Sequence, residues 1–462
     1  MRAVLSSVRD TVRTQLWPLP VLGVVLAVAA GVGLPVVDSA IGDQLPPLLS
    51  QLLFGGDGNA ARSVLGAVAS SLITVTSLTF SLTVVTLQLA SSQFSPRLLR
   101  TFTSDLFVQA TLALFLTTFT YALTVLRTVR GGSDVFVPRL SVTVSYVLAI
   151  ASVLGLVLFL AHLAALIRVE TMLRYVHADA TATVGAVLAE RRDPQDSMAA
   201  PVPPPDSEVL FAASSGFVTS LDEADLVTAA QAAGAVVLLD VSPGHSVVTG
   251  TPIGEAWSED GPLAENTLAE LRSAVAGAVR VGPERTAAQD IGFGLRQLTD
   301  VTNKALSPGI NDPTTAVHAL GHISTLLCEL ADHDLGPTLL RDRTDDDADR
   351  RVRVVVMRPD FAELVDIAIA QPRRYGASDP QLLARLFALL AEIGWRAHPE
   401  QRPVVSHQLA RLRQTVEAEG FDTAELATLR AAGRRVERAL EHRGSAHHSR
   451  EESTAGGAHS AR

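Results

Sequence analysis

Long apolar stretches without a single charged residue recur four times in the first third of the chain. A helix of about 20 mostly apolar residues crosses a hydrocarbon core about 30 Å thick, so each stretch predicts one membrane-spanning helix. Arginines precede the first stretch as they do in a secretory signal, but no small-residue cleavage site stands out, and we expect this helix to be retained. The predicted spans are Leu16–Val37, Ser63–Ala90, Leu106–Leu126 and Leu140–Ile167.

The pattern of polar and apolar positions changes after the fourth span. A charged helical stretch leads into a proline-rich linker, and short β-prone runs between glycine turns then predict a small β-rich module. Helical periodicity follows, with helix start signals at Asp360 and at Asp379 before Pro380, and it is interrupted by one strand at Arg351–Met357. The last residues are rich in Ser, Ala, Gly and His. We therefore expect a membrane α-helical domain (1–168), a helical and proline-rich linker (169–206), then a cytoplasmic α+β domain with a β-rich module (207–285), a mainly helical part (286–442) and a disordered tail (443–462).

Arginines beside the spans set the expected orientation, because short cytoplasmic loops carry an excess of positive charge. Seven arginines lie on the side that holds the N-terminus and the C-terminal domain, and four lie on the opposite side. The count predicts a multi-pass protein of the inner (plasma) membrane, with its N-terminus and C-terminal domain in the cytoplasm. One loop opposes the rule, because it holds Arg127, Arg130 and Arg139 on the outer side.

Composition narrows the classes of function. The formal net charge of -10 argues against a nucleic-acid partner, and the single cysteine, Cys328, excludes an intramolecular disulfide and fits a reducing compartment. The chain has no Walker loop, no dinucleotide-binding glycine fingerprint and no Gly-x-Ser-x-Gly elbow, so it predicts neither a familiar enzyme nor a cofactor. The expected partners are the lipid bilayer and further copies of the chain.

The second span differs from the other three in its hydroxyl content. At about 100° per residue, one continuous polar stripe runs along this helix and a stripe of threonines adjoins it. Small hydroxyl residues let helices pack closely and also line water-filled paths, so the pattern fits both a packing face and a pore-lining face. The first stripe consists of Ser63, Ser70, Thr74, Ser77, Ser81, Gln88 and Ser92, and the second of Thr76, Thr79, Thr83 and Thr86.

A compact loop signal lies in the helical part at residues 307–316. Ser-Pro-Gly ends one helix, and Asp312 followed by proline starts the next, so the segment predicts a tight helix–turn–helix corner. Lys304, Asn311 and Asp312 converge on this corner, where backbone amides of a helix start could help to hold an anion or a polar ligand. A well-formed turn and a ligand site both fit the pattern.

Histidines supply the remaining candidates for function. His318 and His322 lie four residues apart on the helix after the corner, a spacing at which two side chains can share a metal ion. No glutamate completes a metalloprotease pattern beside them, so they are weak metal candidates. His162, near the end of the fourth span, is expected at the membrane interface rather than in a proton relay.

Several motifs resemble a known family. The stretches Ser77–Ser81 and Gln88–Arg97, taken with Asp290 and the loop Ala305–Ala316, are similar to the bacterial predicted-membrane-protein family called domain of unknown function 2254. The resemblance runs from the first span to about residue 435. It implies the membrane topology and the motif boundaries, and it supplies no mechanism.

Two hypotheses of function follow from these patterns. The first is a homo-oligomeric channel or transport-like protein, in which the hydroxyl-rich second helix lines a polar path and the cytoplasmic domain regulates it. The alternative is a membrane-anchored sensor or scaffold that binds a ligand or partner through its cytoplasmic domain. A channel requires the polar stripe to be wet, whereas a scaffold requires it to be packed and dry.

Overall fold

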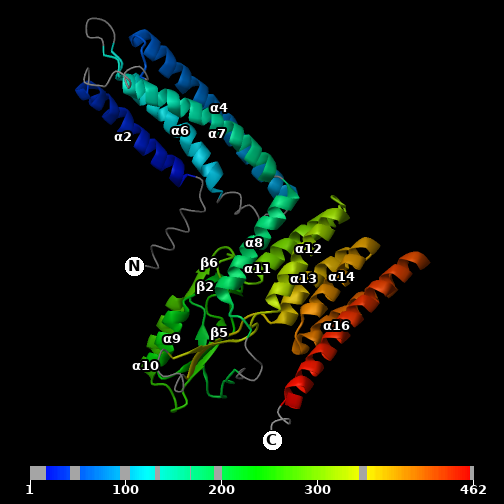
Figure 1. Cartoon of the computed structure of the whole chain (residues 1–462). Coiled ribbons are helices and arrows are strands. Elements are labelled where there is room, and N and C mark those ends of the chain that lie inside the picture. Colours follow the sequence, from blue (N-terminus) through cyan, green and yellow to red (C-terminus); the bar gives the residue numbers. More distant parts are fainter. Residues whose placement is uncertain are drawn as a thin grey trace. The chain divides into compact units, whose positions relative to one another are not determined.

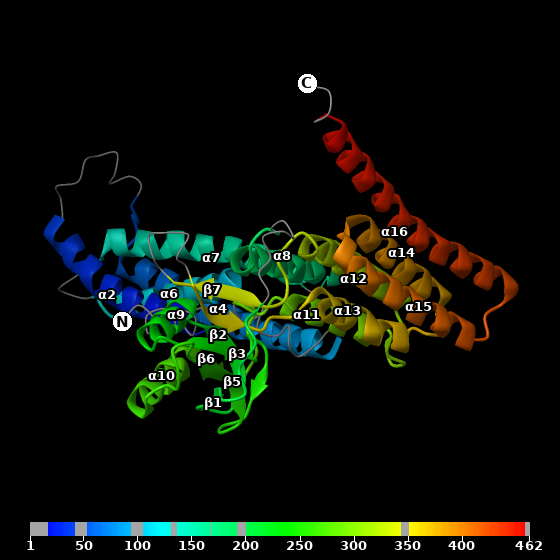
Figure 2. The ribbon, with the colours of Figure 1, turned by 90° about the horizontal axis from the view of Figure 1, so that it is seen from below.

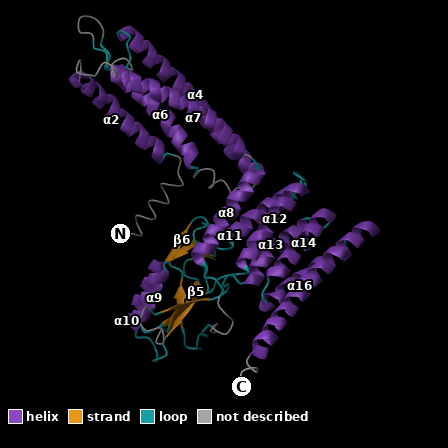
Figure 3. Ribbon diagram, viewed as in Figure 1, coloured by secondary structure: helices purple, strands orange, loops and turns teal. Residues whose placement is uncertain are grey.

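Helices make up 66% of the structure, and strands gather in one part of it (Figure 3). The computed structural model describes residues 17–41, 53–93, 105–130, 136–166, 168–191, 200–342 and 351–457. The chain divides into two units, Met1–Thr171 and Met172–Arg462, which we call the membrane unit and the C-terminal unit (Figure 1). Each unit is described by itself.

Among the residues described for the membrane unit, four helices are long and apolar enough to cross a membrane, which confirms the expected number. α6 is the central helix, because it packs against each of the other three and half of its most apolar window is buried. The corresponding buried shares are 22% for α2, 28% for α4 and 17% for α7, so these three helices present most of their surface outward. The helices are α2 (Pro18–Ile41), α4 (Gly58–Gln93), α6 (Leu106–Leu126) and α7 (Arg139–Leu166).

Aspartates join the helices at both ends of this bundle. The carboxylate of Asp38, near the end of α2, accepts hydrogen bonds from the N–H groups of Leu140 and Ser141, each at 3.0 Å, and so caps the start of α7. At the other end, Asp105 is the N-cap of α6, and its second carboxylate oxygen lies 2.7 Å from Nε2 of His162 in α7. Each aspartate therefore connects two helices through residues that are distant in sequence.

Two sheets form the β-rich part of the C-terminal unit. One has the order β1-β5-β3-β8-β7 and the other the order β4-β2-β6, and β8 runs parallel to β3. β7 and β8 come from the segment expected to be mainly helical, so the β-rich module and the helical part share one sheet. The strands are β1 (Glu208–Phe211), β2 (Gly216–Leu221), β3 (Val236–Leu239), β4 (Ser246–Val247), β5 (Pro252–Trp257), β6 (Val279–Gly282), β7 (Thr338–Arg341) and β8 (Val352–Val356).

β3 is buried along its whole length because both faces of the larger sheet are covered. Val237 and Leu239 pack with apolar residues of α9 (Glu223–Ala232) and α10 (Glu265–Ala278) on one face. Val236 and Leu238 pack with Trp257 on the other face. The continuous apolar run of this strand thus reflects two-sided burial.

The remaining helices of the C-terminal unit pack side by side (Figure 2). Local start signals set several of them, as the sequence predicted: Asp312 and Asp379 cap helices that begin with proline, and Asp360 forms a capping box with Glu363. The helices are α8 (Val169–Val187), α11 (Phe293–Ala305), α12 (Pro313–Leu330), α13 (Phe361–Tyr375), α14 (Pro380–Arg396), the 3₁₀ turn η5 (Pro399–Gln401), α15 (Arg402–Ala418) and α16 (Thr423–Gly457).

α16 is longer than the sequence indicated. The expected end was at about His442 with a disordered tail from residue 443, whereas the helix of the structure continues to Gly457. No proline interrupts residues 443–457, so the helix can continue from the nucleus that the preceding residues supply.

α8 is fastened along its length to the rest of the C-terminal unit. The hydroxyl of Thr183 donates to the carbonyl of Ala287 at 2.9 Å, and the buried guanidinium of Arg358 donates to the carbonyl of Val187 at 3.0 Å. About one turn before Thr183, a Cβ added to Gly294 of α11 would lie 2.3 Å from the Cβ of Ala180. The absence of a side chain at Gly294 is therefore what lets α11 approach α8 so closely.

We expect Gly294→Ala to destabilise the protein by about 1–3 kcal/mol, because the added methyl group overlaps Ala180. Gly321→Ala is the matched control, since Gly321 lies in the interior of α12 with open space at its Cβ, and alanine there should stabilise by about 0.5–1 kcal/mol. Thermal unfolding of the purified full chain in detergent measures both changes. Equal effects of the two substitutions would contradict the close approach of α8 and α11.

Candidate functional site

The two hydroxyl stripes of α4 lie in different environments. The threonine stripe, which we call the buried threonine face, is packed against the other helices of the membrane unit, with Thr79 fully buried. Each of its hydroxyls donates to the carbonyl four residues earlier, at 2.6–2.9 Å, so no donor is left unsatisfied. This face consists of Thr76, Thr79, Thr83 and Thr86.

The other stripe lies on the opposite side of the helix, not beside the threonines as expected, and points away from the membrane unit. Six members of the predicted stripe, which we call the polar face of α4, are exposed: Ser63, Ser70, Thr74, Ser77, Ser81 and Gln88. Thr74 and Ser81 donate to the carbonyls of Ser70 and Ser77 at 3.1 and 3.0 Å, which satisfies their donors within the helix. The oxygen lone pairs and the amide of Gln88 still give this face a polar character.

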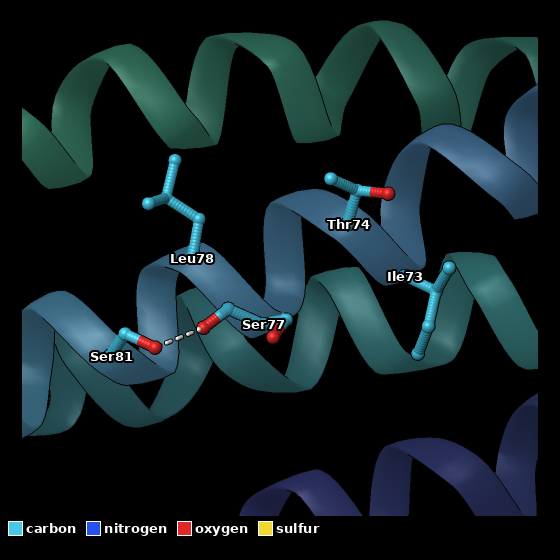
Figure 4. A pocket seen from close by; sticks show the side chains of 5 residues that line it. All are labelled: Ile73, Thr74, Ser77, Leu78 and Ser81. Atoms are coloured by element: carbon cyan, nitrogen blue, oxygen red, sulfur yellow. Dashed lines mark hydrogen bonds between the residues drawn. The ribbon is translucent and has the colours of Figure 1, made fainter.

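The polar face is hollowed at its middle. Figure 4 shows that the side chains lining the hollow all belong to α4, so the hollow is an open groove on one helix. Polar Thr74, Ser77 and Ser81 share it with apolar Ile73 and Leu78. A surface of this kind can accept a ridge of side chains from another helix or a column of water.

The outward faces of the other helices are apolar. α2 exposes valines and leucines such as Val25 and Leu26, and α7 exposes residues such as Val153, Leu154 and Val157, as hydrocarbon requires. α6 has a mean hydropathy as low as that of α4, 1.6 against 1.7, but α6 is the central helix of the bundle. α4 combines low hydropathy with an outward position, and in this it differs from the other three spans.

The corner at residues 307–316 is a closed and well-bonded turn. The carboxylate of Asp312 accepts from the N–H of Thr315 at 3.1 Å and from its hydroxyl at 2.6 Å. These bonds hold the pKa of Asp312 below its usual value, and the bond from the Thr315 hydroxyl has the larger effect. Asn311 adopts a φ of 50°, a left-handed conformation that asparagine tolerates, and both Asn311 and Lys304 are exposed.

Asp312 thus works as a helix cap in this structure, which leaves Lys304 and Asn311 as the outward polar groups of the predicted ligand corner. The helix that starts here was predicted from the Asp-Pro signal. Binding of a ligand at the corner stays a prediction.

The histidine candidates do not gather with further metal-binding side chains. His322 of α12 lies against His177 of α8, with ring centroids 5.3 Å apart, and Nδ1 of His177 is buried without a hydrogen-bond partner. His318 is exposed one turn before His322. Across the described ranges, no three His, Cys, Asp or Glu side chains are arranged to hold a metal ion.

The pairing of Asp105 with His162 was missed in the sequence. His162 was placed near a span end, as the structure has it, but its partner lies on the helix before it in the chain. The available signal was local: an aspartate directly before the first apolar residue of a span is an N-cap, and an N-cap carboxylate has a second oxygen free for a neighbouring helix.

Comparison with known proteins places the chain in a family. The family described as "Predicted membrane protein (DUF2254)" matches residues 13–392, which include all four spans, the polar face of α4 and the 307–316 corner. The chain belongs to the DUF2254 family. This confirms the resemblance inferred from the motifs.

Relatives of this DUF2254 chain include the proteins named Uncharacterized protein Mb1321c, from Mycobacterium bovis, and Uncharacterized protein Rv1290c, from Mycobacterium tuberculosis. Each is 34% identical over 448 residues, an alignment that covers 95% of this chain and 83% of the relative. No solved structure matches the chain. The DUF2254 assignment thus supports a multi-pass membrane protein and leaves the activity to be argued from the site.

The single thiol of this DUF2254 chain, that of Cys328, has low reactivity. Burial between α12 and α14, helped by the negative charge of Glu392, raises the pKa of Cys328 to about 11. The nucleophilic thiolate is therefore scarce at neutral pH.

We expect Cys328 to react with maleimide at pH 7.5 about 100-fold more slowly than an exposed cysteine, because a pKa two units higher lowers the thiolate fraction by that factor. The rate should rise as the pH approaches 11. A matched control is Val248→Cys on a Cys328→Ala background, since Val248 is 58% exposed. Equal rates for the native thiol and this control would disprove the shift.

Proposed function

We propose that this protein is a homo-oligomer of the inner (plasma) membrane, in which the α4 helices of several copies meet and their polar faces line a path for ions or small solutes. The C-terminal unit lies in the cytoplasm and regulates this path. One observation carries the proposal: the polar face of α4 lies at the centre of an outward surface, where a lone bundle would meet lipid.

Hydrocarbon disfavours this arrangement for a single copy. Lipid-facing positions of membrane helices are apolar, whereas polar side chains face other helices or a water-filled cavity. The outward faces of α2 and α7 obey this rule. A second copy of the chain, or water held between copies, would give the polar face of α4 the environment it lacks in one bundle.

The length of the polar face favours a path over a local contact. From Ser63 to Gln88 a helix rises about 37 Å at 1.5 Å per residue, which exceeds the roughly 30 Å of a hydrocarbon core. Helix pairs that associate through small residues need only a few contacts within about two turns. A polar stripe along the entire span therefore fits a continuous path better than it fits a dimerisation motif.

Cysteine accessibility distinguishes a wet path from a dry interface. On a Cys328→Ala background, cysteines at Thr74, Ser77 and Ser81 should react with a small charged methanethiosulfonate reagent added to protein in membranes. Thr79→Cys is the matched control, because Thr79 has the same back-bonded hydroxyl on the opposite, buried face. Val153→Cys on α7 controls for lipid exposure.

Protection of all three polar-face cysteines would overturn the path. Disulfide cross-links between copies at Ser77→Cys, combined with that protection, would show a dry oligomer interface in its place. Labelling at the polar face together with protection at Thr79 and Val153 is the result we expect.

Conductance supplies the functional test. The combined Thr74→Leu, Ser77→Leu and Ser81→Leu variant should abolish ion or solute flux in reconstituted bilayers, because leucine removes the polar groups and fills the groove. Val153→Leu with Val157→Leu is the control and should leave flux unchanged, since these positions lie on the apolar face of α7. Unchanged flux in the triple variant would remove α4 from the path.

A further inference from the structure

The contacts of α8 show which loops of the C-terminal unit lie level with the start of α8, the helix that follows the fourth span in the chain. α11 runs antiparallel to α8, because Ala287 and Gly294 meet Thr183 and Ala180 in reverse order. Ala305 is as many residues beyond Gly294 as Val169 is before Ala180. Since the rise per residue is the same, α11 ends level with the start of α8.

α12 begins at the same level. His322 and Glu329 of α12 meet His177 and Thr181 of α8 in the same order, so these two helices run parallel. His322 lies nine residues after the start of α12, and His177 lies eight residues after the start of α8, so the two helix starts are about equally far from this contact. The corner at residues 307–316, which joins α11 to α12, therefore lies level with the first turn of α8.

The turn between α13 and α14 lies at the same end as the corner between α11 and α12. α13 runs parallel to α11, because Thr299 donates to the carbonyl of Ile367 and Asn303 donates to Gln371 at 2.6 Å. The end of α13 and the turn into α14 consequently lie beside the end of α11 (Figure 2). Two loops of the C-terminal unit, 306–312 and 376–379, thus share one end with the start of α8.

The covalent connection between α7 and α8 keeps the start of α8 close to the end of a membrane span. α7 ends at Leu166 and α8 begins at Val169, and three residues reach at most about 11 Å when fully extended. The start of α8 is held within that distance of the end of a membrane span, whatever the tilt of α8. The corner 307–316 joins the two helices that contact α8, and the 376–379 loop lies on the next helix pair, so the loops are about one and two helix diameters from α8.

Side chains at this end have the composition of a membrane interface. Ile310 is 40% exposed on the corner, and Tyr375 at the end of α13 and Tyr175 near the start of α8 are 63% and 53% exposed. Lys304 and Arg374 are exposed beside them. Tyrosines with one apolar and one polar end, together with long cations, are the residues that anchor proteins among lipid headgroups.

Acidic side chains at this end lie at helix starts, including the exposed Glu170 in the first turn of α8. Asp312 and Asp379 are engaged as N-caps, and their charge is offset by the positive ends of the helices they cap. Asp422 likewise accepts from the N–H groups of Ala424 and Glu425 at the start of α16, and the turn that holds it and Glu419 belongs to the α15–α16 pair, the farthest from α8 along the stack of helices.

We infer that this end of the C-terminal unit, with Ile310 and Tyr375 at its tip and Lys304 and Arg374 beside them, rests on the headgroup layer of the membrane that α7 crosses. Ile310 and the tyrosine rings enter the interface, and the two cations contact lipid phosphates. The corner 307–316 is then a membrane-contact loop, and its tight bonding holds Ile310 outward. This contact is independent of whether α4 lines a path.

Depth-dependent quenching tests the contact on the full chain in lipid nanodiscs. On a Cys328→Ala background, an environment-sensitive fluorophore is attached to Ile310→Cys or Tyr375→Cys, and the lipid carries a spin label on its headgroup. Val248→Cys is the matched control, because it follows a turn that packs beside Asp290 at the opposite end of α11. All three positions are exposed, so the substitutions leave the core intact.

The labels at Ile310 and Tyr375 should be quenched about twofold or more relative to the label at Val248. Adding Lys304→Glu and Arg374→Glu should reduce this quenching in membranes that contain anionic lipid, because the cations then no longer hold the end against the surface. Quenching at Ile310 no greater than at Val248 would overturn the inference, as would quenching that the double charge reversal leaves unchanged.

Discussion

The lack of water in hydrocarbon is the constraint on which the membrane unit depends. Every polar group there must find a partner within the protein, because lipid offers none. The threonines of α4 return their hydroxyl protons to their own helix, and the central helix α6 covers them. Charged side chains appear at the bundle ends, where Asp38 and Asp105 each satisfy a helix start and bind a second helix. Polar groups thus stabilise the bundle at its ends, and the polar face of α4 departs from this rule.

Buried charges of the C-terminal unit follow a related rule. Arg285 donates to the buried carboxylate of Asp290, and Arg358 donates to Glu223 as well as to the end of α8. Burial raises the pKa of Asp290 in spite of the opposing charge of Arg285, which shows how strongly this carboxylate is withdrawn from water. Gly244 makes room for the pair, because its φ of 96° and its missing side chain let the turn before β4 close over Asp290. The ion pair therefore joins the β-rich part to the start of α11.

Local signals in the sequence were enough to predict the four spans, the helix starts at Asp312, Asp360 and Asp379, and the two stripes of α4. These features depend on residues within a few turns of one another. The sequence alone did not distinguish the two stripes, because the buried one is defined by α6, a different helix. The pairing of β3 with β8 and of Asp105 with His162 also escaped prediction, since each joins residues brought together only by the complete fold. The length of α16 was missed for a different reason: the composition of residues 443–457 is compatible with both disorder and helix.

Symmetry limits how the polar faces can meet. All copies insert with one orientation, so copies that form a ring must share an axis along the membrane normal. At about 100° per residue, Ile73 and Val84 lie on one side of the polar face and Leu78 and Leu89 on the other. In a ring, the first apolar flank of one α4 can pack against the second flank of the next copy, and the hydroxyls between the flanks then face the axis. α2 and α7 would keep their apolar faces toward lipid, and the C-terminal units would all lie on one side of the membrane.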